Sequence, residues 1–220
     1  MFTGIIEGLG TITAVRPAGS GKRLAITADF PLNGTKIGDS IAVNGACLTA
    51  VTIADTRFEV DMSPETVEKT CFKQVKIGER ANIERALRLS DRLDGHLVSG
   101  HIDGTGRITH KTRNANAILV GFSVPETLAR YLIPKGSVAI DGISLTVNRC
   151  DQHSFEVSII PHTAGLTTIG FKNIGDMVNL ETDMIGKYVE KFLTGGKGNE
   201  PDKNSNKSVD MEYLLKTGFI

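Results

Sequence analysis

The 220-residue sequence lacks the features that mark several common classes of protein. Its three cysteines, Cys47, Cys71 and Cys150, are widely spaced and form no C-x-x-C pair, which excludes the usual disulfide and zinc patterns. Acidic and basic residues balance at 25 each, so the chain has no basic footprint for nucleic acid. No apolar run approaches the roughly 18 residues of a membrane span. These absences predict a cytoplasmic protein with reduced thiols that binds neither nucleic acid nor membrane.

Several catalytic and ligand-binding motifs are missing as well. The sequence contains no Walker motif and no G-x-S-x-G. The stretch from Gly104 to Gly106 resembles half of a dinucleotide fingerprint, but no βαβ pattern surrounds it, so a turn is predicted there. His96 and His101 are five residues apart, which is not a standard metal spacing. We therefore predict no metal site and interpret His96 as a structural histidine.

An internal duplication is the strongest feature that the sequence does have. A shift of 97 residues lays 38–84 on 135–181 without gaps, with fifteen identities in 47 positions. Unrelated segments of ordinary composition would share roughly three. The opening TGIIEGLGTI aligns with SGHIDGTGRI, which begins at Ser99, at a shift of 96. A period of this length is a whole domain rather than a solenoid repeat.

Each half is predicted to consist of short strands. The stretches 23–30, 40–53, 57–63 and 79–86 alternate apolar with polar residues and are rich in Val, Ile, Thr and Phe. Asn44-Gly45 and Asp141-Gly142 are typical of tight turns. Strands of this length at this spacing, without helical patterns between them, indicate an antiparallel barrel or sandwich in each half.

The end of the chain has no counterpart in the first half. Residues 182–193 place one apolar stripe on a helix: Met184, Ile185, Tyr188, Val189, Phe192 and Leu193. The helix either lies on the chain's own barrels or mediates self-association, and we favour self-association because the two halves are complete without it. The predicted divisions are 1–96, 97–181, 182–193 and a flexible tail, 194–220, that ends in a short amphipathic segment.

The two halves agree at three places that suit a small-molecule cleft. Backbone donors and hydroxyls recur there, so one reading is a cleft in each half, and the other is that any copy of this fold would keep the same strand and turn residues. The matched residues are Gly4, Ile5 and Ile6 with Gly100, His101 and Ile102; Cys47, Leu48 and Thr49 with Ser144, Leu145 and Thr146; and Asp61, Met62, Ser63, Pro64, Glu65 and Thr66 with Ser158, Ile159, Ile160, Pro161, His162 and Thr163.

Differences between the copies favour the cleft. The second half has His101, Lys135 and Asp183 at the positions of Ile5, Gly38 and Ala86 in the first. Polar groups present in one copy only indicate two related pockets with unequal roles.

At these residues the sequence resembles the riboflavin synthase family, α-chain type. The motifs MFTGII, NGACLT, DGHLVSGH, GISLTV, IIPHT and DMIGKY carry the resemblance, which covers about residues 1–193. Asp94 stands where the family usually has glycine. The resemblance implies an all-β fold of two six-stranded Greek-key β-barrels followed by a C-terminal helix, and a homotrimer built through that helix.

The resemblance also implies a reaction, the last step of riboflavin biosynthesis. Two molecules of 6,7-dimethyl-8-ribityllumazine dismutate: one donates a four-carbon unit to the other, giving riboflavin and 5-amino-6-ribitylaminouracil, without a cofactor. Two copies of one binding domain suit a reaction between two copies of one molecule. The alternative is a non-catalytic lumazine or flavin carrier of the same fold.

The family's site lies between the first barrel of one subunit and the second barrel of its neighbour. Carried over to this sequence, Cys47 and Thr49 belong to the first-barrel ligand. His101 is a candidate base or proton shuttle, and Cys47 or Ser144 is a candidate nucleophile or hydrogen-bonding group. Around the second-barrel ligand the resemblance implies Ser144, Thr146, His101, Lys135 and Asp183. Association of the trimer with lumazine synthase is a further expectation.

Overall fold

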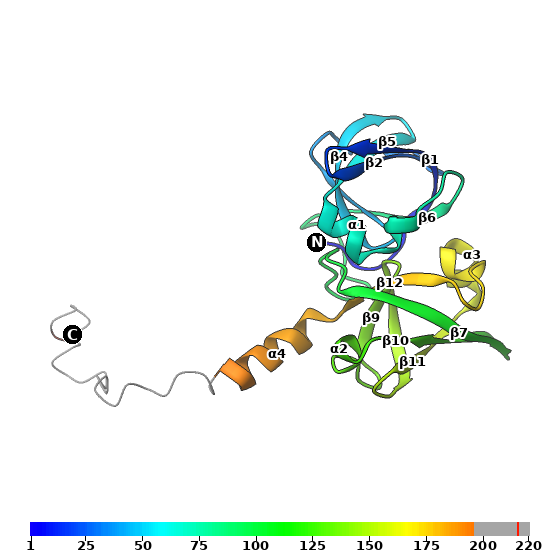
Figure 1. Ribbon diagram of the computed structural model, residues 1–220, viewed down its shortest axis with the longest axis vertical. Coiled ribbons are helices and arrows are strands. Elements are labelled where there is room, and N and C mark those ends of the chain that lie inside the picture. The colour runs from blue at the N-terminus through cyan, green and yellow to red at the C-terminus, as the bar shows by residue number, and fades with distance from the viewer. Residues whose placement is uncertain (196–214, 216–220) are drawn as a thin grey trace. The chain divides into compact units, whose positions relative to one another are not determined.

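The computed structural model describes residues 1–195 and residue 215, and most of its regular structure is β-strand (Figure 1). The predicted amphipathic segment at the end of the chain lies outside the described residues. The strands of the first half are β1 (Gly8–Ala18), β2 (Gly21–Ala28), β3 (Ser40–Val43), β4 (Ala46–Ala54), β5 (Arg57–Met62) and β6 (Arg80–Arg85). Those of the second half are β7 (Gly104–Asn114), β8 (Ala117–Ser123), β9 (Ser137–Ile140), β10 (Ile143–Cys150), β11 (Ser154–Ile159) and β12 (Met177–Thr182).

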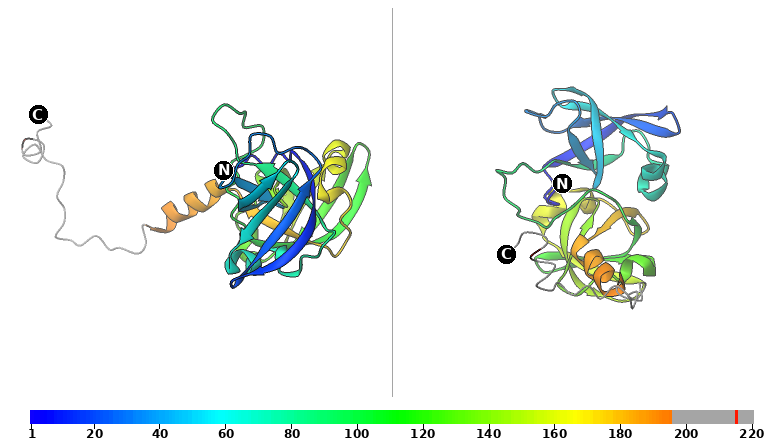
Figure 2. Two further views of the ribbon diagram at one scale, coloured as in Figure 1. Left: turned by 90° about the horizontal axis from the view of Figure 1, so that it is seen from above. Right: turned by 90° about the vertical axis from the view of Figure 1, so that its left-hand side faces the viewer.

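Each half closes into an antiparallel six-stranded barrel with the same strand order. The first runs β1-β2-β5-β4-β3-β6 and the second β7-β8-β11-β10-β9-β12, each closing back on its first strand. Figures 1 and 2 show the two barrels next to each other. Closure leaves no free sheet edge, and the alternating pattern sends every second side chain inward. The predicted pair of six-stranded Greek-key barrels is therefore confirmed.

Each barrel has its own apolar core. Phe58 and Phe72 fill the first, and Phe122 and Phe155 stack in the second with ring centroids 5.0 Å apart. A short helix follows the fifth strand of each barrel, namely α1 (Pro64–Lys69) and α3 (Pro161–Leu166), and leads into the 3₁₀ turns η1 (Cys71–Gln74) and η2 (Thr168–Gly170). A further short helix, α2 (Glu126–Ala129), precedes β9.

The barrels meet at matching positions of the two copies, where two glycine turns approach each other closely. Gly45 and Gly142 approach so closely that a Cβ on Gly45 would lie 2.6 Å from the Gly142 nitrogen. Both have positive φ, near +80°, which glycine adopts without strain. Farther along, Phe2 and Val98 form an antiparallel bridge between matching positions of the two copies, and both are buried.

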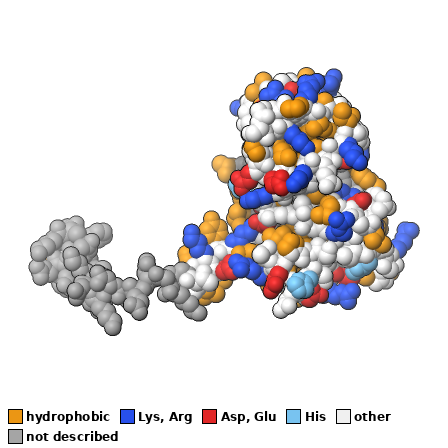
Figure 3. Space-filling view, in the orientation of Figure 1, with side chains coloured by type: hydrophobic (Ala, Val, Ile, Leu, Met, Phe, Trp, Pro, Cys, Tyr) orange, Lys and Arg blue, Asp and Glu red, His pale blue; other side chains and the backbone are white. Residues whose placement is uncertain are grey.

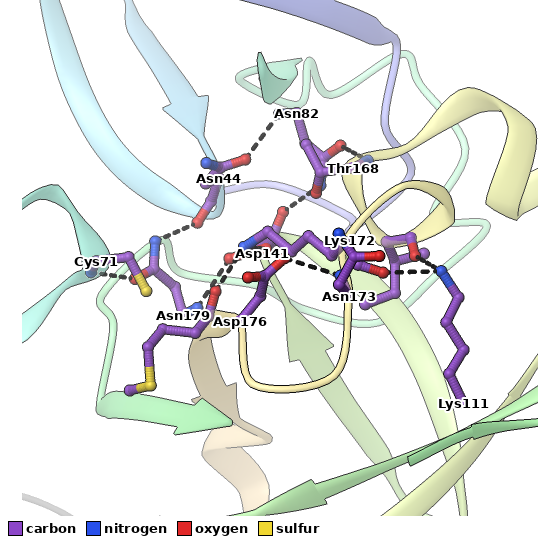
Figure 4. A network of polar contacts seen from close by, with 12 residues as sticks. Asn44, Cys71, Asn82, Lys111, Asp141, Thr168, Lys172, Asn173, Asp176 and Asn179 are labelled. Atoms are coloured by element: carbon purple, nitrogen blue, oxygen red, sulfur yellow. Dashed lines mark hydrogen bonds and ion pairs between the residues drawn. The ribbon is translucent and has the colours of Figure 1, made fainter. Parts of the chain in front are cut away.

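Two buried asparagines join the barrels through hydrogen bonds to the partner barrel (Figure 4). Asn82 donates to the Asp141 carbonyl at 2.9 Å and accepts from the Thr168 N–H at 2.8 Å. Asn179 repeats this at the matching places, donating to the Asn44 carbonyl at 2.9 Å and accepting from the Cys71 N–H at 2.8 Å. Because both amides are fully buried and bonded on both sides, they fix the relative placement of the barrels.

The final helix, α4 (Met184–Gly195), begins two residues after the predicted start. Of its predicted apolar stripe, Ile185, Tyr188, Val189, Phe192 and Leu193 are exposed in the single chain. Such a stripe on a surface helix is the pattern of a face that packs on another element.

Candidate active site

The site is built around two short segments, at Gly4 and Gly100. Each is hydrogen-bonded to a buried glutamate carboxylate. Thr3 donates its N–H and hydroxyl to Glu84 at 2.6 and 2.7 Å, and the Gly4 N–H donates to the same carboxylate at 3.1 Å. Burial raises the pKa of Glu84, and the hydrogen bonds from Thr3 and Gly4 oppose that shift. The segment is thereby held rigidly on the last strand of its own barrel.

The second copy uses the same device. Ser99 donates to Glu181 through its N–H at 2.6 Å and its hydroxyl at 2.7 Å, and the Gly100 N–H donates at 2.9 Å. Sequence analysis missed both glutamates, although each ends a matched stretch, NIE and NLE, at equivalent places in the two halves. A matched acid at the end of a buried strand was the signal available.

The glycine segments cross over between the barrels, which corrects the prediction of one cleft lined by three places of the same half. The Ser144 N–H donates to the Gly4 carbonyl at 2.8 Å, and the Cys47 N–H donates to the Gly100 carbonyl at 2.8 Å. Ile6 packs against the core of the second barrel and Ile102 against that of the first. Each candidate cleft therefore combines the strand residues of one copy with the glycine segment of the other.

The cleft at the first barrel has a cavity of about 430 Å³. Cys47 from β4 and Thr66 from α1 line one side, and His101 and Asp103 from the crossing segment line the other. His101 thus lies beside Cys47, whereas the sequence-based assignment had placed it around the second-barrel ligand. Its side chain is exposed, and its N–H donates to the Ser99 hydroxyl at 3.1 Å.

Helix α1 adds Lys69, which sequence analysis missed, as the partner of the predicted Glu65. Glu65 and Lys69, at i and i+4, form an ion pair of 2.7 Å at this cleft. The hydrogen bond to Lys69 lowers the pKa of Glu65. The hydroxyl of Ser63 caps the helix by accepting from the Thr66 N–H at 3.1 Å, so Ser63 has a structural role here.

Side chains along each strand point alternately into the barrel core and toward the surface, and this separates the remaining predicted residues into buried and accessible ones. Leu48, Met62 and Ile159 are buried in the cores, so their side chains do not line a cleft. Thr49 and Thr146 are exposed, on the same strand faces as Cys47 and Ser144. Others on the strand ends and short helices divide between exposed and half-buried positions: Ser158, Ile160, Pro161 and His162 are exposed, while Asp61, Thr163 and Leu145 are half-buried.

Lys135 occupies a turn position along the backbone. Its φ is +69°, like the +93° of Gly38 at the matching place, and its N–H donates to the Val147 carbonyl at 2.7 Å. The side chain is exposed. Asp183 follows β12 directly and acts electrostatically on His96.

At the second barrel, Ser144 is engaged by a residue that sequence analysis interpreted as structural. His96 Nδ1 lies 2.7 Å from Ser144 Oγ. In the sequence alignment Ile5 corresponds to His101, so the two sites differ in their polar groups. Cys47 and His101 mark the first cleft, and Ser144 and His96 mark the second.

A larger cavity of about 910 Å³ lies beside the first barrel. Its lining includes Glu7 and Arg85, which form an ion pair of 2.5 Å, together with Ile5 and Lys36. On the face in view, basic and acidic side chains are interspersed over the barrels (Figure 3). Within residues 1–195 and at residue 215, no three His, Cys, Asp or Glu side chains cluster as metal ligands. No helix in that part of the chain has the length and apolarity needed to cross a bilayer.

Comparison with known proteins bears on this duplicated architecture. One family model, described as lumazine binding domain, matches the chain twice, over residues 3–86 and 99–183. The chain is 43% identical to the riboflavin synthase of Actinobacillus pleuropneumoniae and 41% identical to that of Bacillus subtilis (strain 168), with 100% of both chains covered in each case. It is 42% identical to the riboflavin synthase of Mycobacterium tuberculosis (strain ATCC 25618 / H37Rv), over 88% of this chain and 98% of that protein.

Solved structures share the fold. The chain resembles LumP complexed with riboflavin with a TM-score of 0.75 and LumP complexed with 6,7-dimethyl-8-(1'-D-ribityl) lumazine with a TM-score of 0.73. In both, the identity is 24%, and the match covers 83% of this chain and 99% of the other. Fold and matches together define a protein with two lumazine-binding domains. The chain belongs to the riboflavin synthase family, as the sequence predicted.

Proposed function

We propose that this enzyme forms riboflavin by holding two lumazine molecules in the two crossed clefts and assisting the transfer of a four-carbon unit between them. The observation that carries the proposal is the crossed arrangement at both barrels with different polar groups: Cys47 and His101 line a cavity at the first barrel, and His96 contacts Ser144 at the second. A dismutation needs one donor and one acceptor of the same molecule. Two sites with the same backbone arrangement but different side chains suit one donor and one acceptor.

The chemistry asks the protein for positioning and proton transfer. The methyl group at carbon 7 of a lumazine is acidic because its anion delocalises into the ring, and the transfer of the four-carbon unit conserves all atoms between riboflavin and 5-amino-6-ribitylaminouracil. Holding both rings in a reactive arrangement is worth roughly 7–11 kcal/mol of the barrier. His101, exposed in the first cleft, is the group proposed to move a proton there.

The proposed assembly is a homotrimer in which the first barrel of one subunit faces the second barrel of its neighbour. The exposed apolar face of α4 supports it, because such a stripe is buried in most proteins by a partner element. We retain 1–96 and 97–181 as the lumazine-binding units and a cytoplasmic location. Association with lumazine synthase stays a prediction, tested by co-sedimentation of the two proteins.

The reaction itself is tested with the lumazine as the sole substrate. We expect the purified chain to produce riboflavin fluorescence in the presence of EDTA and without added nicotinamide or flavin. Stopping turnover of folded protein by chelation or dialysis would contradict the cofactor-free mechanism. Tight binding of lumazine without any flavin formed would instead identify the non-catalytic carrier.

Ending the chain after Met184 tests the role of α4. This truncation keeps Asp183 and all twelve strands. We expect sedimentation to show monomers in place of trimers, and most of the activity to be lost, because a cleft shared between subunits is then incomplete. The matched control replaces Lys187 and Lys191 with glutamine and should leave the trimer intact. A trimer that survives the truncation would exclude self-association through this helix.

A further inference from the structure

Ser144 is enclosed by backbone on two sides, which limits the groups that can reach its hydroxyl. Its N–H is bonded to the Gly4 carbonyl, and the neighbouring Gly95 has no room for a side chain. A Cβ on Gly95 would lie 2.0 Å from the Thr3 carbonyl oxygen and 3.1 Å from Ser144 Cβ. The backbone of the linker between the barrels therefore runs directly against the serine.

This close approach sets the position of the next residue, His96. Its N–H donates to the Thr3 carbonyl at 3.1 Å, which fixes the backbone, and its ring places Nδ1 at 2.7 Å from Ser144 Oγ. The ring is half-buried, and burial lowers the pKa of His96 while the Asp183 carboxylate opposes that shift. A neutral imidazole has one ring nitrogen free to accept a hydrogen bond.

The first barrel offers a contrast at the matching place. Cys47 corresponds to Ser144, and its N–H makes the same bond to the crossing glycine segment. Within the part of the chain that the structure describes, the Cys47 thiol makes no hydrogen bond to a histidine. The contact between His96 and Ser144 is thus specific to one of the two clefts.

We propose that His96 is a positioning residue for Ser144: its Nδ1 accepts a hydrogen bond from the serine hydroxyl, which turns the Oγ lone pairs toward the bound lumazine. The inference rests on the proposed function for the presence of lumazine at this cleft. Ser144 then acts at the ligand as a hydrogen-bond acceptor with a fixed direction. His96 itself does not touch the substrate.

A double-mutant cycle tests the coupling between the two side chains. We expect His96→Ala to lower kcat roughly 10- to 100-fold with KM changed less than about threefold, because misdirected groups cost rate rather than ground-state binding. His96→Asn, whose Oδ1 replaces Nδ1 as acceptor, should recover most of kcat. In a Ser144→Ala background, His96→Ala should cause almost no further loss. His153→Ala, at an exposed turn of the second barrel, is the matched control.

Two outcomes would overturn the proposal. One is a double variant whose losses multiply, and the other is a His96→Ala variant that raises KM with kcat unchanged. If His96→Ala does not fold, the comparison of His96→Asn with His96→Gln decides, since only asparagine places its oxygen near the Nδ1 position. Equal rates for the two would contradict a role for Nδ1.

A readout that needs no turnover separates this inference from the proposed function. In ¹⁵N spectra of histidine-labelled protein, His96 is assigned by its absence from the His96→Asn spectrum. We expect its Nδ1 signal to be that of an unprotonated acceptor at pH 7 and to shift in Ser144→Ala. A wild-type chain that makes no flavin but shows this shift would overturn the proposed function alone. An Nδ1 signal unchanged by Ser144→Ala would overturn the positioning role.

Discussion

Replacing Lys172 with valine should lower the free energy of unfolding by about 3–5 kcal/mol. Lys172 Nζ lies 2.6 Å from Asp141 Oδ2, and the Asp141 side chain is 1% exposed (Figure 4). Removal of the lysine leaves a carboxylate buried without a counter-ion, which is far costlier than the pair itself. Urea unfolding at pH 7 measures the loss.

The first barrel supplies the control for this prediction. Its residues at the positions of Asp141 and Lys172 are Asn44 and Val75, so the first barrel has an uncharged pair where the second has an ion pair. Asn44 Oδ1 accepts the Asn82 N–H at 2.8 Å, just as Asp141 Oδ1 accepts the Asn179 N–H. The double variant Asp141→Asn, Lys172→Val should therefore return to within about 1 kcal/mol of the wild type. A double variant as unstable as Lys172→Val would refute the ion-pair account.

The pH at which the unfolding of Lys172→Val is measured follows from the direction in which the pKa of Lys172 is shifted in the folded protein. Burial lowers the pKa of Lys172, but the charge of Asp141 and the hydrogen bond to it outweigh burial, so the net pKa is raised above its ordinary value of 10.5. A raised pKa in the folded state contributes stability that is complete below the unfolded pKa and is lost as the pH rises through the folded pKa. The full effect is therefore present at pH 7 and declines only in strongly alkaline solution.

Replacing Gly100 with alanine should reduce riboflavin formation by about 100-fold. Gly100 has a φ of +83°, and a Cβ there would lie 2.5 Å from Cys47 Cβ and 2.9 Å from the Cys47 nitrogen. The backbone must move to relieve this contact, and the movement breaks the bond from Cys47 to the Gly100 carbonyl and displaces His101. The first cleft then loses the side that the crossing segment provides.

Gly78→Ala separates this clash from backbone strain. Gly78 has a similar φ of +91°, but nothing lies within 4 Å of the added Cβ. Both variants carry a left-handed alanine, which costs roughly 1–2 kcal/mol. We expect Gly78→Ala to lose only this strain energy of about 1–2 kcal/mol in stability and to keep its activity. Equal activities of the two variants would show that the crossing segment is not part of the site.

The local sequence determined the strands, the turns between them and the division into two similar halves. Alternating patterns and Asn-Gly or Asp-Gly turns act over a few residues, so they specify strands and hairpins without reference to the rest of the chain. The duplication predicted that both halves have the same fold, and the polar residues present in only one copy predicted two related pockets with unequal roles. Cys47 and Ser144 became candidate site residues in this way, since they stand at one position in both copies.

Only the tertiary structure decided which glycine segment serves which barrel. The segments at Gly4 and Gly100 have the same pattern, so nothing local distinguishes docking on the own barrel from docking on the other. The choice depends on contacts between distant residues: the Phe2–Val98 bridge, the approach of Gly45 to Gly142, and the linker that brings Gly95 against Ser144. For the same reason His96 looked structural in the sequence, where its spacing matched no motif. Its meeting with Ser144, 48 residues away, is created by the packing of one barrel on the other.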